Sequence, residues 1–208
     1  MGFVYNNPTE AMARTFLEMN GWLVQNSLFT DLLSSPNGRS YRLEADLVAF
    51  KPPNTSVIGA QGIIPLDERH DESEDTREFF AGPNAVDNWA YCELKANFLD
   101  ADYARQIRSL VGPSGKETLQ SKQVRIAARF GVPQPKIVVM AYNFTNDVID
   151  TIRANGWYYK RLETMFDFIL DRFNNYWDVK SRIAYNDPWL DMVKHLSAFN
   201  FARPKSSP

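Results

Sequence analysis

The ten residues WAYCELKANF, at positions 89–98, combine an apolar pattern with a charged tripeptide. Side chains in a β-strand alternate between the two faces, so residues two apart project the same way. Glu93 and Lys95 therefore share one face. The opposite, apolar face takes Cys92, Leu94 and Ala96. The stretch predicts a strand that hides one side in the core and shows charge on the other.

A second strand of the same character is predicted upstream, YRLEADLVAF at residues 41–50. Alternation places Glu44 and Asp46 on one face of it, together with Arg42. If the two strands are neighbours, Asp46 converges with Glu93 and Lys95. Neighbouring carboxylates repel each other unless a cation lies between them, and Mg²⁺ or Mn²⁺ suits such oxygen ligands. Glu44 is either a second metal ligand or a partner for Arg42.

The remaining pattern predicts an α/β fold, a mixed β-sheet flanked by helices. A helix is expected from Pro8, with Asn7 as its N-cap, and the apolar run KIVVMAYNF (136–144) predicts a central buried strand. The order α-β-β-β-α-β-α-β-α defines a core over residues 1–160. Residues 161–208 are expected to form an aromatic-rich helical C-terminal extension packed on this core. Residues 66–85 are expected to form an acidic insertion or mobile loop.

These motifs resemble the PD-(D/E)xK nuclease superfamily, which includes restriction endonucleases. The resemblance rests on EADLVA at 44–49 followed by YCELKA at 91–96, and covers the chain from about residue 7 to residue 160. Ala45 stands where a proline often precedes the aspartate. The resemblance implies that Asp46, Glu93 and the Leu94 carbonyl bind the metal, and that Lys95 is the catalytic lysine.

The resemblance implies two further positions. Several members of the superfamily carry a glutamate on the helix before the first strand, where Glu10 stands; the same residue also suits a capping box with Asn7. A glutamine or basic residue is frequent on the helix after the lysine strand. Gln106 is the candidate there, with Arg105 and Arg108 as substitutes.

Basic residues are concentrated between Lys95 and Lys136. This segment contains eight lysines and arginines and three acidic residues, although the whole chain has a net charge of -2. The opposite charge gathers at residues 66–78, with seven acids against two arginines. This asymmetry suits a polyanion met on one face. Lys122, Arg125 and Arg129 form a stripe on one helical face, for which phosphate contact and simple solvation are both open.

Composition excludes several other classes of protein. No stretch approaches the length of a membrane span, the N-terminus lacks the pattern of a secretory signal, and the single Cys92 cannot form an internal disulfide, so we expect a cytoplasmic protein that binds no membrane. The sequence GPSGKE at 112–117 lacks the glycine and hydroxyl residue of a phosphate-binding loop. His70 and His195 have no metal-ligand spacing.

The sequence therefore predicts a metal-dependent endonuclease, a hydrolase that cleaves phosphodiester bonds, with DNA as the expected substrate, by a metal-activated water. Two alternatives stay open. One is a non-catalytic nucleic-acid-binding module that retains the nuclease fold. The other is a subunit of a larger defence, repair or recombination assembly. Because duplex cleavage needs two cuts, a homodimer is also expected.

Overall fold

A computed structural model describes residues 8–34, 40–52, 57–59, 62–64, 73–81, 89–108, 118–175 and 188–198. Within these ranges it leaves out the side chains of residues 26–34, 40–44, 57–59, 62–64, 74, 81, 105–108, 188 and 198. Asn7, His70 and the segments 65–72, 82–88, 109–117 and 199–208 lie outside the described residues. In the part described, no helix is both long enough and apolar enough to cross a membrane.

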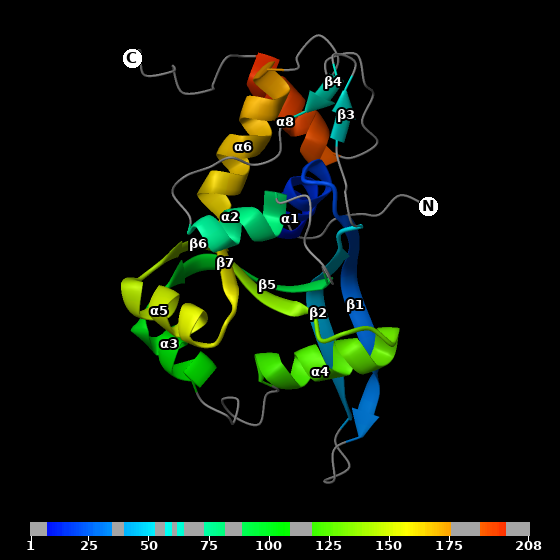
Figure 1. The fold of residues 1–208 in the computed structure, drawn as a ribbon, viewed down its shortest axis with the longest axis vertical. Helices are drawn as coiled ribbons and strands as arrows, with labels where there is room; N and C mark the ends of the chain where they lie inside the picture. Colours follow the sequence, from blue (N-terminus) through cyan, green and yellow to red (C-terminus); the bar gives the residue numbers. More distant parts are fainter. Residues whose placement is uncertain are drawn as a thin grey trace.

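A five-stranded mixed sheet lies at the centre of the fold, in the order β1-β2-β5-β6-β7 (Figure 1). Neighbouring strands are antiparallel from β1 through β2 to β5 and parallel from β5 through β6 to β7. Their bounds are Leu23–Ser34, Ser40–Phe50, Trp89–Leu99, Lys136–Phe144 and Tyr158–Arg161. A separate antiparallel pair joins β3 (Val57–Gly59) to β4 (Gly62–Ile64). The predicted α/β architecture is confirmed.

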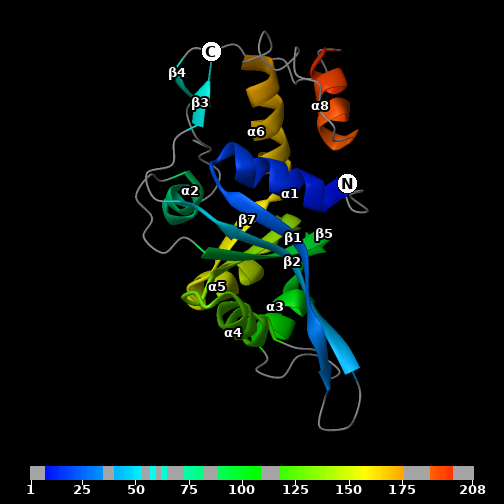
Figure 2. The same cartoon turned by 90° about the vertical axis from the view of Figure 1, so that its right-hand side faces the viewer.

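Helices cover both faces of this sheet (Figures 1 and 2). One layer, here the first layer, contains α1 (Pro8–Met19), α2 (Glu74–Ala81), α6 (Leu162–Asn175) and α8 (Pro188–Ala198). The second layer, on the other face, contains α3 (Ala101–Arg108), α4 (Leu119–Phe130) and α5 (Asn146–Ala154). Each layer shares a buried apolar cluster with one side of the strands. The apolar run of β6 is buried on both sides for this reason.

β5 departs from the simple alternation that its sequence predicts. Cys92 and Leu94 lie in the core of the first layer, as expected, but Ala96 is exposed. The face that carries Glu93 is not open to solvent, because Tyr91 on that face belongs to the core of the second layer. Glu93 itself is only 7% exposed. The prediction of a solvent-facing charged side is therefore wrong for the middle of β5.

Two helix ends follow from the sequence as predicted. Asn20-Gly21 ends α1, and Asn155-Gly156 ends α5; the two glycines have φ of 81° and 66°, a left-handed conformation that costs glycine little. The N–H groups of the tryptophans that follow then donate back to Leu17 and Ile152, at 3.0 and 3.1 Å. Each turn directs the chain from the end of a helix towards the sheet.

Within residues 66–85, expected to form an acidic insertion or mobile loop, residues 74–81 form the helix α2. Phe79 and Phe80 of this helix are buried in the core of the first layer. The Phe80 carbonyl, near the C-terminal end of α2, accepts hydrogen bonds from Lys51 Nζ at 2.7 Å and from Trp22 Nε1 at 3.1 Å. Burial lowers the pKa of Lys51 to about 8. The buried rings of Phe79 and Phe80, together with the hydrogen bonds from Lys51 and Trp22, thus hold α2 against the sheet.

The described part of residues 161–208 includes α6 and α8, which pack on α1 and the sheet. Phe168, Ile169 and Phe173 of α6 and Val193 of α8 are buried with residues of α1 and the sheet. The ring of Phe16 in α1 meets Phe80 and Phe168 edge-on, with centroids 5.4 and 5.5 Å apart. Phe16 therefore joins three helices of the first layer.

We expect Phe16→Ala to lower the free energy of unfolding by about 3–5 kcal/mol, because it opens a cavity between these rings. Denaturant unfolding followed by circular dichroism measures this. Leu23→Ala is the control: Leu23 is 64% exposed, so its loss should change stability by less than about 0.5 kcal/mol. Similar losses for the two variants would contradict the assignment of Phe16 to the core.

Candidate functional site

Asp46 and Glu93 come together where β2 leaves β5. The two strands pair in antiparallel register from Phe50–Trp89 to Leu47–Cys92, so the next residues along are Asp46 and Glu93. The ladder stops there, and β2 continues with β1 as a two-stranded ribbon past the end of the sheet (Figure 2). Asp46 Oδ2 instead accepts a hydrogen bond from the backbone N–H of Leu94 at 2.7 Å.

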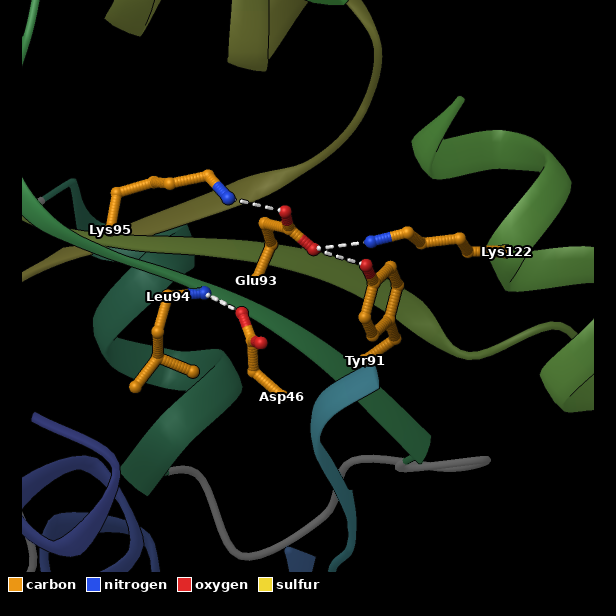
Figure 3. A network of polar contacts seen from close by, with 6 residues as sticks. All are labelled: Asp46, Tyr91, Glu93, Leu94, Lys95 and Lys122. Carbon is orange, nitrogen blue, oxygen red and sulfur yellow. Dashed lines mark hydrogen bonds and ion pairs between the residues drawn. The ribbon is translucent and has the colours of Figure 1, made fainter. Parts of the chain in front are cut away.

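Glu93 is the centre of a polar network (Figure 3). Its Oε1 lies 2.6 Å from Lys95 Nζ, and its Oε2 lies 3.1 Å from Lys122 Nζ. The hydroxyl of Tyr91 also donates to Oε2. Lys95 comes from the same strand, but Lys122 reaches Glu93 from α4 in the second layer. Tyr91, Glu93 and Lys95 share one face, as strand alternation requires.

The pKa values of the two carboxyl groups are shifted in opposite directions. Burial, reinforced by the negative charge of Glu93, raises the pKa of Asp46 to about 6, although the Leu94 N–H and the two lysines act against this shift. Burial also acts to raise the pKa of Glu93, but the charges of Lys122 and Lys95, with the hydrogen bonds from Lys95 and Tyr91, outweigh it and lower that pKa. Glu93 is therefore ionised at neutral pH, whereas burial destabilises the ionised form of Asp46.

Two tyrosines, Tyr91 and Tyr103, lie near the carboxylates of this site. Burial and the charge of Glu93 raise the pKa of Tyr91 well above its ordinary value. Tyr103, on α3, has its pKa raised by burial and by the charges of Glu93 and Asp46. Both phenols therefore stay protonated at neutral pH. Each can donate a hydrogen bond towards negative charge in the site.

The structure assembles the predicted core of the site, Asp46, Glu93 and Lys95, but does not bring Glu10 to it. Glu10 lies near the start of α1, which packs on the opposite face of the sheet. Among the described residues, no group of three or more His, Cys, Asp or Glu side chains is placed to hold a metal ion. A metal ion at this site would therefore have two carboxylate ligands. Mg²⁺ accepts that number when water and substrate oxygens supply the rest.

The predicted nucleic-acid-binding residues lie on two helices, α3 and α4. Gln106, Arg105 and Arg108 lie in α3, the helix directly after the lysine strand, but their side chains are outside the described part of the chain. The stripe of Lys122, Arg125 and Arg129 is not one exposed surface. Lys122 pairs with Glu93, Arg125 is partly buried, and Arg129 is exposed. The three side chains therefore do not form one exposed stripe.

Three site residues have roles that sequence reasoning missed. Tyr91 precedes Glu93 by two residues, so alternation was enough to place it on the same face. Lys122 was expected on a phosphate-binding surface, yet it is a counter-ion of Glu93. Tyr103 carries no local signal, because only the packing of α3 against β5 brings it near the carboxylates. Cys92 faces the other side of the strand and is buried; burial raises the pKa of its thiol, so a nucleophilic role is excluded.

Comparison with known proteins adds no relative. The chain matches no protein-family model, no curated protein and no solved structure. The function must therefore be argued from the geometry of this site.

Asp46→Asn should stabilise the folded protein at neutral pH without added metal. The folded pKa of about 6 lies above the ordinary 3.8, so the folded state binds the proton more tightly, and stability falls as pH rises between these values. Removing the buried charge should raise the free energy of unfolding by roughly 1–3 kcal/mol at neutral pH, with a smaller gain at acidic pH. Denaturant unfolding at several pH values measures this.

Asp150→Asn is the matched control, because Asp150 is exposed on α5 and its replacement should change little. A neutral-pH destabilisation by Asp46→Asn would show that Asp46 does not carry a burial cost.

Proposed function

We propose that this chain is a metal-dependent endonuclease that hydrolyses phosphodiester bonds in DNA. The observation that carries the proposal is the meeting of Asp46 and Glu93 where β2 leaves β5, with Lys95 2.6 Å from Glu93. Burying two carboxylates side by side is costly unless a cation offsets their repulsion. Stability alone would favour apolar side chains at these positions.

The residues present fit a hard divalent ion. Carboxylate oxygens are the ligands that Mg²⁺ and Mn²⁺ prefer, and the raised pKa of Asp46 marks a carboxylate that additional positive charge would stabilise. Asp46 and Glu93 would hold the ion, with the Leu94 carbonyl as the expected third oxygen. When bound, such an ion would acidify a water nucleophile and offset charge on the phosphate.

The chain's own residues contribute orientation and charge. Lys95 is partly exposed, so its ammonium group can reach a phosphate oxygen while it remains beside Glu93. Lys122 and Tyr91 hold the Glu93 carboxylate from the other side. A carboxylate held in this way does not have to reorganise when the substrate binds, which lowers the energetic cost of reaching the transition state.

The order and pairing of the strands also support the proposal. The core order of one helix, three antiparallel strands and a fourth strand parallel to the third agrees with the nuclease resemblance. Under that resemblance the aspartate belongs on the second strand and the E-x-K motif on the third. Asp46 in β2 and Glu93 with Lys95 in β5 meet this requirement if β3 and β4 are counted as an insertion.

Asp46→Ala, Glu93→Ala and Lys95→Ala are each expected to lower metal-dependent cleavage by a factor on the order of 10²–10⁴, because each removes a ligand or a charge needed in the transition state. Cleavage of plasmid and single-stranded DNA with Mg²⁺ or Mn²⁺ measures this. Asp150→Ala and Lys136→Ala match the charges removed at exposed positions and should keep wild-type activity. Equal activity in all these proteins would refute the proposal.

A non-catalytic nucleic-acid-binding module is the second candidate, and one observation favours it. Each oxygen of Glu93 already faces a lysine, and Asp46 already accepts the Leu94 N–H, so the site is satisfied without a metal. In this reading the network is a structural clamp between β5 and α4. The two candidates differ in whether the carboxylates bind a divalent ion.

Titration calorimetry with Mn²⁺ separates the two candidates. The proposed nuclease should bind Mn²⁺ in the absence of DNA, and Glu93→Ala should weaken this binding at least about tenfold, as loss of a ligand requires. Glu163→Ala, at an exposed carboxylate on α6, serves as the control. Absence of Mn²⁺ binding by the wild-type protein would favour the non-catalytic module.

A further inference from the structure

The two oxygens of Glu93 have different sets of partners. Oε1 accepts a hydrogen bond from Lys95 Nζ at 2.6 Å. Oε2 accepts one from Lys122 Nζ at 3.1 Å and another from the Tyr91 hydroxyl. The two lysines approach the carboxylate from opposite sides (Figure 3). Among the described residues, Oε1 therefore has one donor and Oε2 has two.

The two lysines also differ in how firmly they are held. Lys122 projects from α4, which is fixed to the sheet by Leu119 and Ile126, both buried in the core of the second layer. Lys95 lies in β5 just before the exposed Ala96, and its side chain is 35% exposed, against 19% for Lys122. A long, partly exposed side chain changes its rotamer at a small cost. Lys95 is therefore the lysine that can leave Glu93 more easily.

Lys95 also has the greater effect on the second carboxylate. Burial raises the pKa of Asp46 to about 6, and the charges of both lysines act against this rise, Lys95 more strongly than Lys122. Lys95 thus bonds Glu93 directly and offsets part of the charge of Asp46 at the same time. A divalent ion held by both carboxylates would act on the same two groups.

We propose that a divalent ion binds Glu93 through Oε1 in place of Lys95, while Tyr91 and Lys122 keep their hydrogen bonds to Oε2. Lys95 is then the substitute for the ion in the metal-free protein, and it leaves Glu93 when the ion binds. The two cations exclude each other because like charges at bonding distance from one oxygen repel strongly in a partly buried site. The inference rests on the proposed function for the presence of an ion at Asp46 and Glu93.

This exchange couples the position of Lys95 to the binding of the ion. Without the ion, the Lys95 ammonium is engaged by Glu93. Once displaced, the ammonium needs another anion, and a phosphodiester bound beside the ion supplies one. The exchange also explains how the site can be satisfied without a metal and still bind one, because the same oxygen serves two cations in turn. Ion binding and the release of Lys95 are thus linked reciprocally.

Titration calorimetry with Mn²⁺, without nucleic acid, tests the exchange through Lys95→Met. The substitution keeps an unbranched side chain and removes the charge that competes with the ion. We expect Lys95→Met to bind Mn²⁺ roughly tenfold more tightly than the wild type, which is the size of effect that one close charge has on another charged group. A lysine that only holds Glu93 in position predicts the opposite sign. Lys136→Met, at an exposed lysine of β6, is the matched control and should bind Mn²⁺ like the wild type.

Lysine labelling of the wild-type protein is a second measurement that needs no variant. A short pulse of an amine-reactive ester, followed by mass spectrometry, reports how accessible each lysine amine is. We expect Mg²⁺ to raise the labelling of Lys95 several-fold relative to sodium chloride of equal ionic strength. The amine is then released from Glu93, and the nearby ion favours its neutral, reactive form. Labelling of Lys122, which stays on Oε2, and of the exposed Lys136 should not change.

The outcomes for the two proposals are distinguishable. If the wild type binds Mn²⁺ but Lys95→Met binds it no more tightly, or if Mg²⁺ leaves the labelling of Lys95 unchanged, the exchange is overturned and the nuclease function stays intact. Increased labelling of Lys122 in place of Lys95 also overturns it, because the ion would then take Oε2. If Lys95→Met binds Mn²⁺ more tightly but the wild type cleaves no DNA, the nuclease function is refuted and the exchange stays intact. Absence of Mn²⁺ binding by both proteins overturns both.

Discussion

The candidate site depends on one interaction, the compensation of the buried negative charge of Glu93. Glu93 lies beneath the second layer of helices, where an unpaired carboxylate would cost several kcal/mol. Its three partners come from two elements: Tyr91 and Lys95 from its own strand, and Lys122 from α4. The packing of α4 on the sheet is therefore coupled to the chemistry of the site.

The same requirement explains the difference between the two carboxylates. Among the described residues, Glu93 accepts hydrogen bonds from both nearby lysines, whereas Asp46 accepts one from a backbone N–H. Asp46 is consequently the less acidic group, with a pKa raised to about 6. A buried carboxylate whose pKa is raised in the folded state is poor for stability at neutral pH. It is expected where a binding site has been favoured over stability.

The end of the β2–β5 ladder and a register shift between β5 and β6 flank this site. β2 leaves β5 at Asp46, and the register between β5 and β6 shifts after Lys95. Between these two irregularities lie Glu93, Leu94 and Lys95. Regular pairing would have continued the β2–β5 ladder past Asp46 and Glu93. The two carboxylates thus meet where the regular geometry of the sheet ends.

Much of the local structure could be predicted from the sequence, because it depends on short-range rules. Alternation along a strand places Glu93 and Lys95 on one face, and the Asn-Gly turns end α1 and α5. The apolar run of β6 implied burial on both sides. By contrast, the acidic composition of residues 66–78 suggested an acidic insertion or mobile loop and gave no sign that Phe79 and Phe80 are buried. The position of α2 depends on long-range hydrogen bonds from Trp22 and Lys51 to the Phe80 carbonyl.

The sequence by itself determined the α/β class, the two charged strands, and the candidates Asp46, Glu93 and Lys95, because strand periodicity and carboxylate chemistry are local properties. The tertiary structure decided that Lys122 and Tyr103 join them and that Glu10 does not. These outcomes depend on which helix covers which side of the sheet and on strand register. Both depend on contacts between residues that are distant in the chain, and a local sequence pattern contains no information about such contacts.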